Sequence, residues 1–436
     1  MRFERRLETP RWLSVAVPIA SVAVAIVLSG LVLLATQHDP VHTFSRIFQR
    51  GFTGKGALTQ TLISSTPLLF TGLAAAVAFR MQVWNIGGEG QLYLGALCSS
   101  GAGLVLRDQS GPVIIAAMIV AGLLGGLAWG VIPGLLRARF STNEIITSLM
   151  LNYVAGLLLT YLIFDSRSYW RDLSSFSGQT FPQGKPLVDA AAWPSLLTGI
   201  NPAADLLLVL VGMAAWGTWR RRRAGGPWQP STGAALAYGV ALVVVLAWLV
   251  TKPNLIVRVP MGFFVGLLVA AGLWVLFRST RFGFEVRVIG DSPAAAGYAG
   301  MRTRRKIVSV MALSGAVAGL GGASQVGDFR HVLDPRGLEQ SGFGYTGIVV
   351  AALARYNPFA VALVAVLLGG VSNAGYALQG PDFPAGLVGV VQGMILFCAL
   401  GGELLVNYRF RLGSHTTVDD PPAGGEPTPL LVEALG

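Results

Sequence analysis

Long apolar runs recur along the whole chain, and most are about as long as a helix that crosses a bilayer, which takes about 20 apolar residues. They lie at 13–36, 61–79, 84–106, 113–136, 145–164, 204–219, 233–251, 261–278, 307–326, 343–354, 358–376 and 386–405. The run at 343–354 is too short to span alone, which favours a half-helix or re-entrant piece. The pattern predicts an all-α, polytopic membrane bundle of about 10–12 transmembrane helices with broken or re-entrant segments.

A glycine-rich polar stretch, MQVWNIGGEGQLYLGAL at 81–97, stands between two of these runs. Polar side chains at membrane depth are costly, and they usually mark a path for a solute or ion. Irregular backbone is tolerated there where it lines a cavity rather than lipid. We therefore look for function first in this stretch.

Composition agrees with a membrane protein, because 53% of the 436 residues are hydrophobic, 12% are charged and the mean hydropathy is +0.61. We predict one transmembrane domain over 1–412 and a disordered cytoplasmic tail, rich in Pro, Gly and acidic residues, over 413–436. The pI near 10.1 reflects basic residues in the loops. No basic face is interleaved with aromatic residues, so nucleic acid is excluded as a partner.

The basic residues also predict orientation, since short cytoplasmic loops hold an excess of Lys and Arg. Clusters at 2–11, at 220–223 and at 278–306 place both termini in the cytoplasm. Residues 204–251 look like an inserted helical hairpin, and Arg220 to Arg223 within it either contact membrane lipid headgroups or only set the topology. The main outside loop, 165–203, is predicted to be an ordered cap or docking surface, or a plain linker.

The loop at 279–306 is too long and patterned for a simple turn, and it contains the signature of a short helix. Ser292 is suited to cap that helix and Pro293 to open it. Small side chains and one aromatic favour docking into a partner's groove over lying on lipid. The docking residues are Ser292, Pro293, Ala294, Ala295, Ala296, Gly297, Tyr298 and Gly300.

Four ordered blocks resemble a known family. They are NIGGEGQLYLGA at 85–96, STNEIITSLMLNY at 141–153, FGFEVRVIGDSPAAAGYAGM at 282–301 and GFGYTGIVVAALARYNP at 342–358. Together they are similar to the permease subunits of bacterial ABC importers for simple sugars and nucleosides, within the branched-chain amino acid and ribose permease superfamily. The nucleoside permeases are the nearest branch; a ribose-type or a branched-chain amino acid permease is the alternative.

The resemblance implies a transport subunit of the bacterial plasma (inner) membrane, not an enzyme. Its implied partners are a second paralogous permease, a cytoplasmic ABC ATPase with two fused cassettes, and an extracytoplasmic substrate-binding lipoprotein. Residues 291–301 would be the coupling helix. ATP and Mg would be used by the ATPase, and no cofactor by this chain, because GFTGKG at 51–56 lacks the spacing of a phosphate-binding loop.

A further alternative is a secondary transporter driven by an ion gradient, which needs an intramembrane carboxylate or His relay. Apart from Glu89, the predicted spans hold almost no ionisable residues. The sequence shows no catalytic constellation, and its histidines lack metal-ligand spacing.

Residues for the pathway follow from the ligand that the resemblance implies. A neutral, hydroxyl-rich nucleoside calls for uncharged donors and acceptors and an aromatic face. Glu89 has three candidate roles, in which it bonds a ribose hydroxyl, caps a neighbouring half-helix or lies at an aqueous edge; we favour the cap. The pathway candidates are Asn85, Gly87, Gly88, Glu89, Gln91, Tyr93, Tyr345 and Thr346.

One further pair, Asn143 and Glu144, opens the span at 145–164. Ser141 or Thr142 is expected to cap that helix, and Glu144 to complement its N-terminus.

Overall fold

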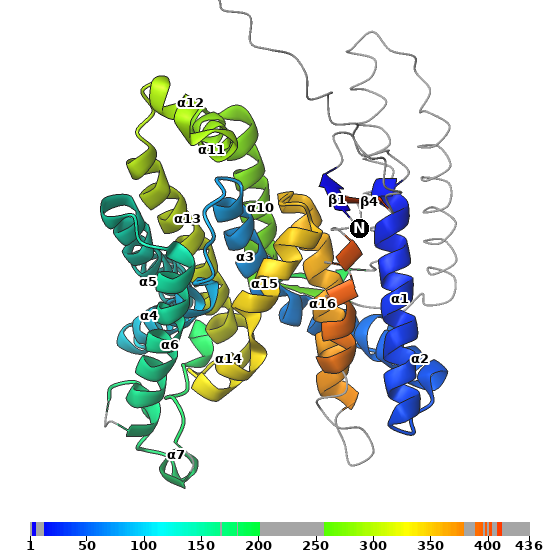
Figure 1. The fold of residues 1–436 in the computed structure, drawn as a ribbon. Helices are drawn as coiled ribbons and strands as arrows, with labels where there is room; N and C mark the ends of the chain where they lie inside the picture. The colour runs from blue at the N-terminus through cyan, green and yellow to red at the C-terminus, as the bar shows by residue number, and fades with distance from the viewer. Residues whose placement is uncertain are drawn as a thin grey trace, which may run out of the picture.

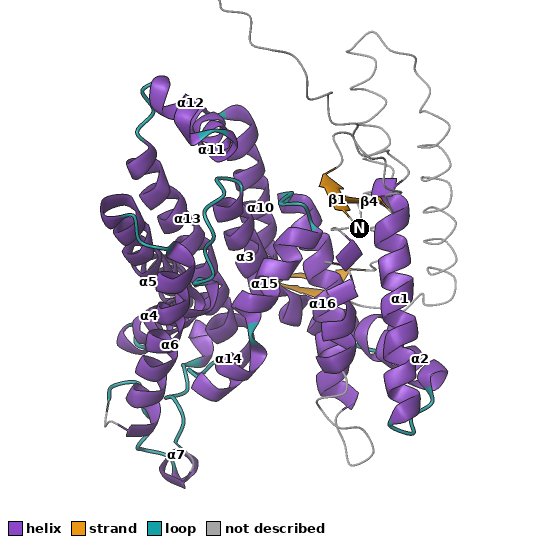
Figure 2. Cartoon of the chain, in the orientation of Figure 1, coloured by secondary structure: helices purple, strands orange, loops and turns teal. Residues whose placement is uncertain are grey.

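The computed structural model describes residues 2–5, 13–165, 168–180, 182–200, 257–378, 389–395, 397–398, 401–402 and 408–411. Helices dominate this part of the chain, with two small two-stranded sheets (Figures 1 and 2). The predicted hairpin at 204–251 and the predicted tail at 413–436 lie outside the described residues.

Six helical segments of the described chain are long and apolar enough to cross a membrane, or up to seven if a bent pair at 23–35 and 40–53 forms one span. They are α3 (Ala57–Phe79), α5 (Gly111–Phe140), α6 (Glu144–Thr160) with the π-helix η2 (Tyr161–Asp165), α10 (Met261–Ser279), α13 (Thr303–Ser324) with the π-helix η4 (Gln325–Arg330), and α16 (Pro358–Leu378). The bent pair comprises part of α1 (Leu13–Ala35), then α2 (Pro40–Phe48) and η1 (Gln49–Thr53). The predicted polytopic helical bundle is confirmed.

Two helices of the bundle begin partway along their neighbours. One is α4 (Gly88–Val105), and the other is α15 (Phe343–Leu353), which follows α14 (Pro335–Ser341). With 11 residues, α15 is about 16 Å long and too short to cross alone, as predicted.

Helices α3 and α13, which precede α4 and α15, run antiparallel to each other. Ser314 of α13 donates to the Ala74 carbonyl of α3 at 2.7 Å, whereas the later residue Ser324 and the earlier residue Thr66 both lie against Gly262. The chain leaves α3 through an irregular segment at 80–87 and enters α4, and it leaves α13 through η4 and α14 and enters α15. Because α3 and α13 are antiparallel, the connection from α3 to α4 and the connection from α13 to α15 run in opposite directions. The N-termini of α4 and α15 are in contact.

Glycines allow α5 and α13 to pack with their backbones in contact. A Cβ on Gly126 would overlap the Gly315 carbonyl oxygen, and one on Gly130 would lie 2.6 Å from the Met311 oxygen. Spacing of four residues keeps such glycines on one helix face, the small-residue packing typical of membrane helices. The α5 stripe consists of Gly122, Gly126, Gly130 and Gly134.

The ends of the described chain come together. Strand β1 (Arg2–Arg5) pairs antiparallel with β4 (Tyr408–Arg411), in the same half of the bundle as α11 (Arg281–Asp291) and α12 (Pro293–Tyr298) (Figure 1). At the opposite end lies α7 (Phe176–Thr180). The chain continues through the short helix η3 (Asp189–Ala191) to β2 (Ser195–Ile200), which pairs antiparallel with β3 (Val257–Pro260), the strand directly before α10. Strands β1 and β4 therefore lie on one side of the bundle, and the cytoplasmic location of both termini stays a prediction.

Candidate functional site

A single carboxylate lies between the N-termini of α4 and α15. Glu89, in the first turn of α4, accepts a hydrogen bond from the Gly344 amide in the first turn of α15. Glu89 is 2% exposed, and Gly344 approaches so closely that an added Cβ would overlap the Glu89 backbone nitrogen. Because both helix ends carry partial positive charge, one anion complements two helices. The capping role favoured for Glu89 is the contact that the structure contains.

The irregular segment before α4 is held by a closed network of side chains. Asn85 donates to Gln91 Oε1 at 2.9 Å and to Ser314 Oγ at 2.8 Å, and its Oδ1 accepts from Gln91 Nε2 at 3.1 Å. Asn85 Oδ1 also accepts the Gly87 amide at 3.0 Å. Asn85 and Gln91 thus tie the break to α4 and α13, and in this conformation the Asn85 side chain uses both its donors and its acceptor oxygen within the protein.

Asn152 of α6 joins the break to α15. It accepts from the Gly90 amide at 2.8 Å and donates to the Ile86 carbonyl at 2.9 Å and to the Tyr345 hydroxyl at 3.3 Å. Tyr345 is 42% exposed whereas Tyr93 is only 4% exposed, and Thr346 is half-buried. Among the predicted polar and aromatic pathway residues, Tyr345 therefore offers the largest open surface. The sequence analysis missed Asn152 and Ser314, although both interrupt apolar runs.

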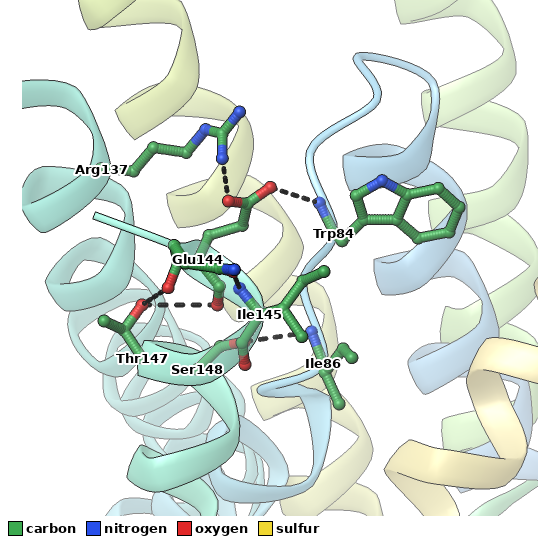
Figure 3. Close-up of polar contacts among 8 residues, drawn as sticks. Trp84, Ile86, Arg137, Glu144, Ile145, Thr147 and Ser148 are labelled. Atoms are coloured by element: carbon green, nitrogen blue, oxygen red, sulfur yellow. Dashed lines mark hydrogen bonds and ion pairs between the residues drawn. The ribbon is translucent and has the colours of Figure 1, made fainter. Parts of the chain in front are cut away.

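A second carboxylate, at the start of α6, fixes the same segment (Figure 3). Glu144, at the start of α6, forms an ion pair with Arg137 of α5 and accepts the Trp84 amide at 3.2 Å. Ser148 accepts the Ile86 amide at 3.2 Å. The expected cap at Ser141 or Thr142 is wrong, because Ser141 adopts φ 55° and closes α5; Asn143 caps α6 instead, accepting from the Ile145 amide at 2.9 Å.

The short helix predicted in the loop at 279–306 is present as α12. Ser292 accepts from the Ala295 amide at 3.3 Å, Pro293 opens the helix, and buried Ala296 anchors it. Tyr298 is 95% exposed, and a Cβ on Gly297 would meet nothing within 4 Å.

The sequence analysis did not anticipate α11, which fills most of the loop before α12. This helix is amphipathic, and its Gly290 packs against the Arg80 carbonyl at the end of α3. The loop at 279–306 is therefore largely helical and docked onto the bundle.

At the opposite end, residues 168–180 and 182–200 form an ordered cap, the first of the predicted alternatives. The Leu187 amide donates to the His331 carbonyl at 2.9 Å, and the Trp193 amide donates to the Gly327 carbonyl at 3.0 Å. Asp172 accepts from the Ser175 hydroxyl and from the amide and hydroxyl of Ser174. These bonds, with Ser175 the largest influence, hold the Asp172 pKa well below its usual range.

The chain resembles known transport proteins over most of its length. The family described as "branched-chain amino acid transport system / permease component" matches residues 57–400. The glucose ABC transporter permease protein TsgB13 of Haloferax volcanii is 30% identical, over 97% of both chains. The guanosine permease NupP of Bacillus subtilis is 28% identical over 87% of this chain and 91% of its own, and the nucleoside permease NupB of Lactococcus lactis is 25% identical over 88% and 90%.

No solved structure matches the chain significantly. The family match spans the helices that build the Glu89 site and the loop that carries α12. This chain belongs to the family of branched-chain amino acid transport system permease components.

Proposed function

We propose that the chain is the membrane-spanning permease subunit of an ATP-driven importer and forms the pathway for nucleosides or simple sugars. The observation that carries this proposal is the similarity to a glucose permease over 97% of both chains. Relatives named for guanosine and nucleosides support the same class of neutral, hydroxyl-bearing solute. Four side chains at the break agree with that class, because Asn85, Gln91, Asn152 and Tyr345 are uncharged donors and acceptors. The two carboxylates there are already engaged, Glu89 with the Gly344 amide and Glu144 with Arg137.

The solute path passes the junction of α4 and α15. Tyr345 supplies an aromatic face and a hydroxyl, while Asn85, Gln91 and Thr346 supply polar groups once the closed network opens. Gly87 and Gly88 permit close approach of neighbouring helices, because a Cβ on Gly87 would lie 3.0 Å from Ser148 Cβ and one on Gly88 would lie 3.8 Å from Gly344 Cα. Tyr93 lies one turn beyond Glu89 on the same helix. Broken helices with N-termini at a shared site are the arrangement that transporters use to bind solutes.

Helix α12 transmits the energy of ATP hydrolysis to the membrane-spanning helices. Its exposed residues, above all Gly297 and Tyr298, dock into a cytoplasmic ATPase with two fused cassettes, and a second permease completes the pathway. The ordered cap at 168–200 receives a substrate-binding lipoprotein on the other side of the inner membrane. Both termini then lie in the cytoplasm with α12.

The test is uptake into proteoliposomes that contain the assembled transporter, with labelled guanosine and labelled glucose as alternative substrates. We expect uptake to require ATP and the binding protein, and unlabelled nucleosides or sugars to compete. Uptake that continues without ATP and collapses with the ion gradient would refute the proposal.

A further inference from the structure

A cavity of about 590 Å³ opens between α11 and the beginning of α13. Arg281, Phe284 and Glu285 line it from α11, and Arg302, Arg305 and Lys306 line it from the other side. Four basic side chains thus surround one carboxylate. The cavity lies at the end of the bundle that the Lys and Arg distribution predicts to be cytoplasmic.

The carboxylate neutralises only part of this charge. Glu285 accepts hydrogen bonds from Lys306 at 2.7 Å and from Arg281 at 2.9 Å. Lys306 is the larger influence and Arg281 adds to it, and together they lower the Glu285 pKa, so Glu285 is ionised at neutral pH. Within the described part of the chain, Arg302 and Arg305 have no acidic partner. Two cations therefore remain for an anionic ligand.

An apolar surface borders these cations. Phe284 is 60% exposed although α11 buries its opposite face, with Val286 and Ile289 in the core. The cavity stands between the end of α10 at Ser279 and the start of α13 at Thr303, two membrane-spanning helices. Cations beside an exposed aromatic at the level where spans end suit an amphiphile with a charged head and an apolar body.

We propose that this cavity binds the headgroup of an anionic phospholipid, with the lipid phosphate between Arg302 and Arg305 and its glycerol region against Phe284. Basic pockets between transmembrane helices on the cytoplasmic side recognise such headgroups. The site is separate from the solute path, so it stands whether or not the chain carries nucleosides.

The experiment uses the full chain in detergent and titrates it with phosphatidylglycerol or phosphatidylcholine, with bound lipid counted by native mass spectrometry. The test variant is R302Q/R305Q, and the matched control is R304Q, whose exposed arginine does not line the cavity. Each cation near an anionic headgroup contributes about five-fold in affinity, so the double variant should bind phosphatidylglycerol roughly 30-fold more weakly. Wild type and R304Q should prefer phosphatidylglycerol to phosphatidylcholine.

Three results would overturn the proposal. They are equal binding of both lipids by the wild type, unchanged phosphatidylglycerol binding by R302Q/R305Q, and displacement of the lipid by millimolar inorganic phosphate, which identifies a site for free anions. If the second result is accompanied by loss of ATPase association in R302Q/R305Q, the cavity is assigned to a protein contact instead. R302K/R305K keeps both charges and should retain the lipid, which separates lost binding from misfolding.

Discussion

Glu89 is the residue whose replacement tests the meeting of α4 and α15 most directly. Replacing it with Ala removes the only hydrogen bond that the structure gives the Gly344 amide across the junction, and it leaves two helix N-termini facing each other without an anion. Replacing it with Gln keeps an acceptor oxygen in nearly the same place but removes the charge. The two variants therefore separate hydrogen bonding from electrostatics.

The magnitude follows from burial. A buried N–H left unpaired costs about 1–3 kcal/mol, and a carboxylate at a partly buried helix N-terminus contributes up to about 2 kcal/mol. E89A incurs both costs, but it also removes the desolvation cost of a buried charge, which offsets part of them. We therefore expect E89A to lower the free energy of unfolding by about 2–4 kcal/mol. E89Q should cost about half as much.

The assay is unfolding of the full chain by titration with SDS in mixed micelles, followed by circular dichroism. D108N is the control, because the Asp108 side chain is 87% exposed and its neutralisation removes one charge without touching the junction. The reasoning fails if E89A unfolds within about 0.5 kcal/mol of D108N. It also fails in its electrostatic part if E89Q equals the wild type.

Three further predictions rest on other parts of the bundle. G126A should destabilise the chain by about 1–3 kcal/mol in the same titration, because its Cβ would overlap the Gly315 carbonyl and force α5 away from α13; G272A, which meets nothing within 4 Å, should not. Y298E and G297E should leave insertion and basal ATPase activity of the assembled transporter intact yet abolish uptake, since both positions are open, and unchanged uptake would contradict docking through α12. The Asp172 pKa is lowered in the folded cap, so its stabilisation is present above the unfolded pKa and is lost as the pH falls below about 4. The protection of the amides in 172–180 and 182–185 against hydrogen exchange, measured relative to their intrinsic exchange rates at each pH, should therefore fall at acid pH in the wild type and already at neutral pH in D172N.

Apolar periodicity located the helices well, since predicted runs such as 61–79 and 358–376 correspond to α3 and α16 within a few residues. Local signals also sufficed for α12, because a Ser cap and a Pro at the first position act within one turn. The short length of α15 could be predicted for the same reason. In each case the determinant lies within the segment itself.

Contacts between distant segments could not be predicted in this way. Ser314 is 229 residues from Asn85, and Asn152 is 193 residues from Tyr345, so nothing local pairs them. The cap of α6 was misplaced because a tight turn at Ser141 shifts the helix start. The glycine stripe at 122, 126, 130 and 134 was visible in the sequence as a repeat of four, but only packing identifies α13 as its partner.

Helix α13 connects three parts of this molecule, which are α12, the irregular segment at 80–87 and the ordered cap. It starts just after α12, contacts the irregular segment through Ser314, and continues into η4. The Gly327 carbonyl of η4 accepts a hydrogen bond from the Trp193 amide of the cap. A helix transmits displacement along its axis because its backbone hydrogen bonds keep the rise per residue constant. Its contact with α5 is lined by glycine backbone, which leaves few interlocking side chains to resist sliding. A shift imposed on α12 by a docked ATPase would therefore reach the Asn85 network and the cap through one rigid element, which is the coupling that import requires.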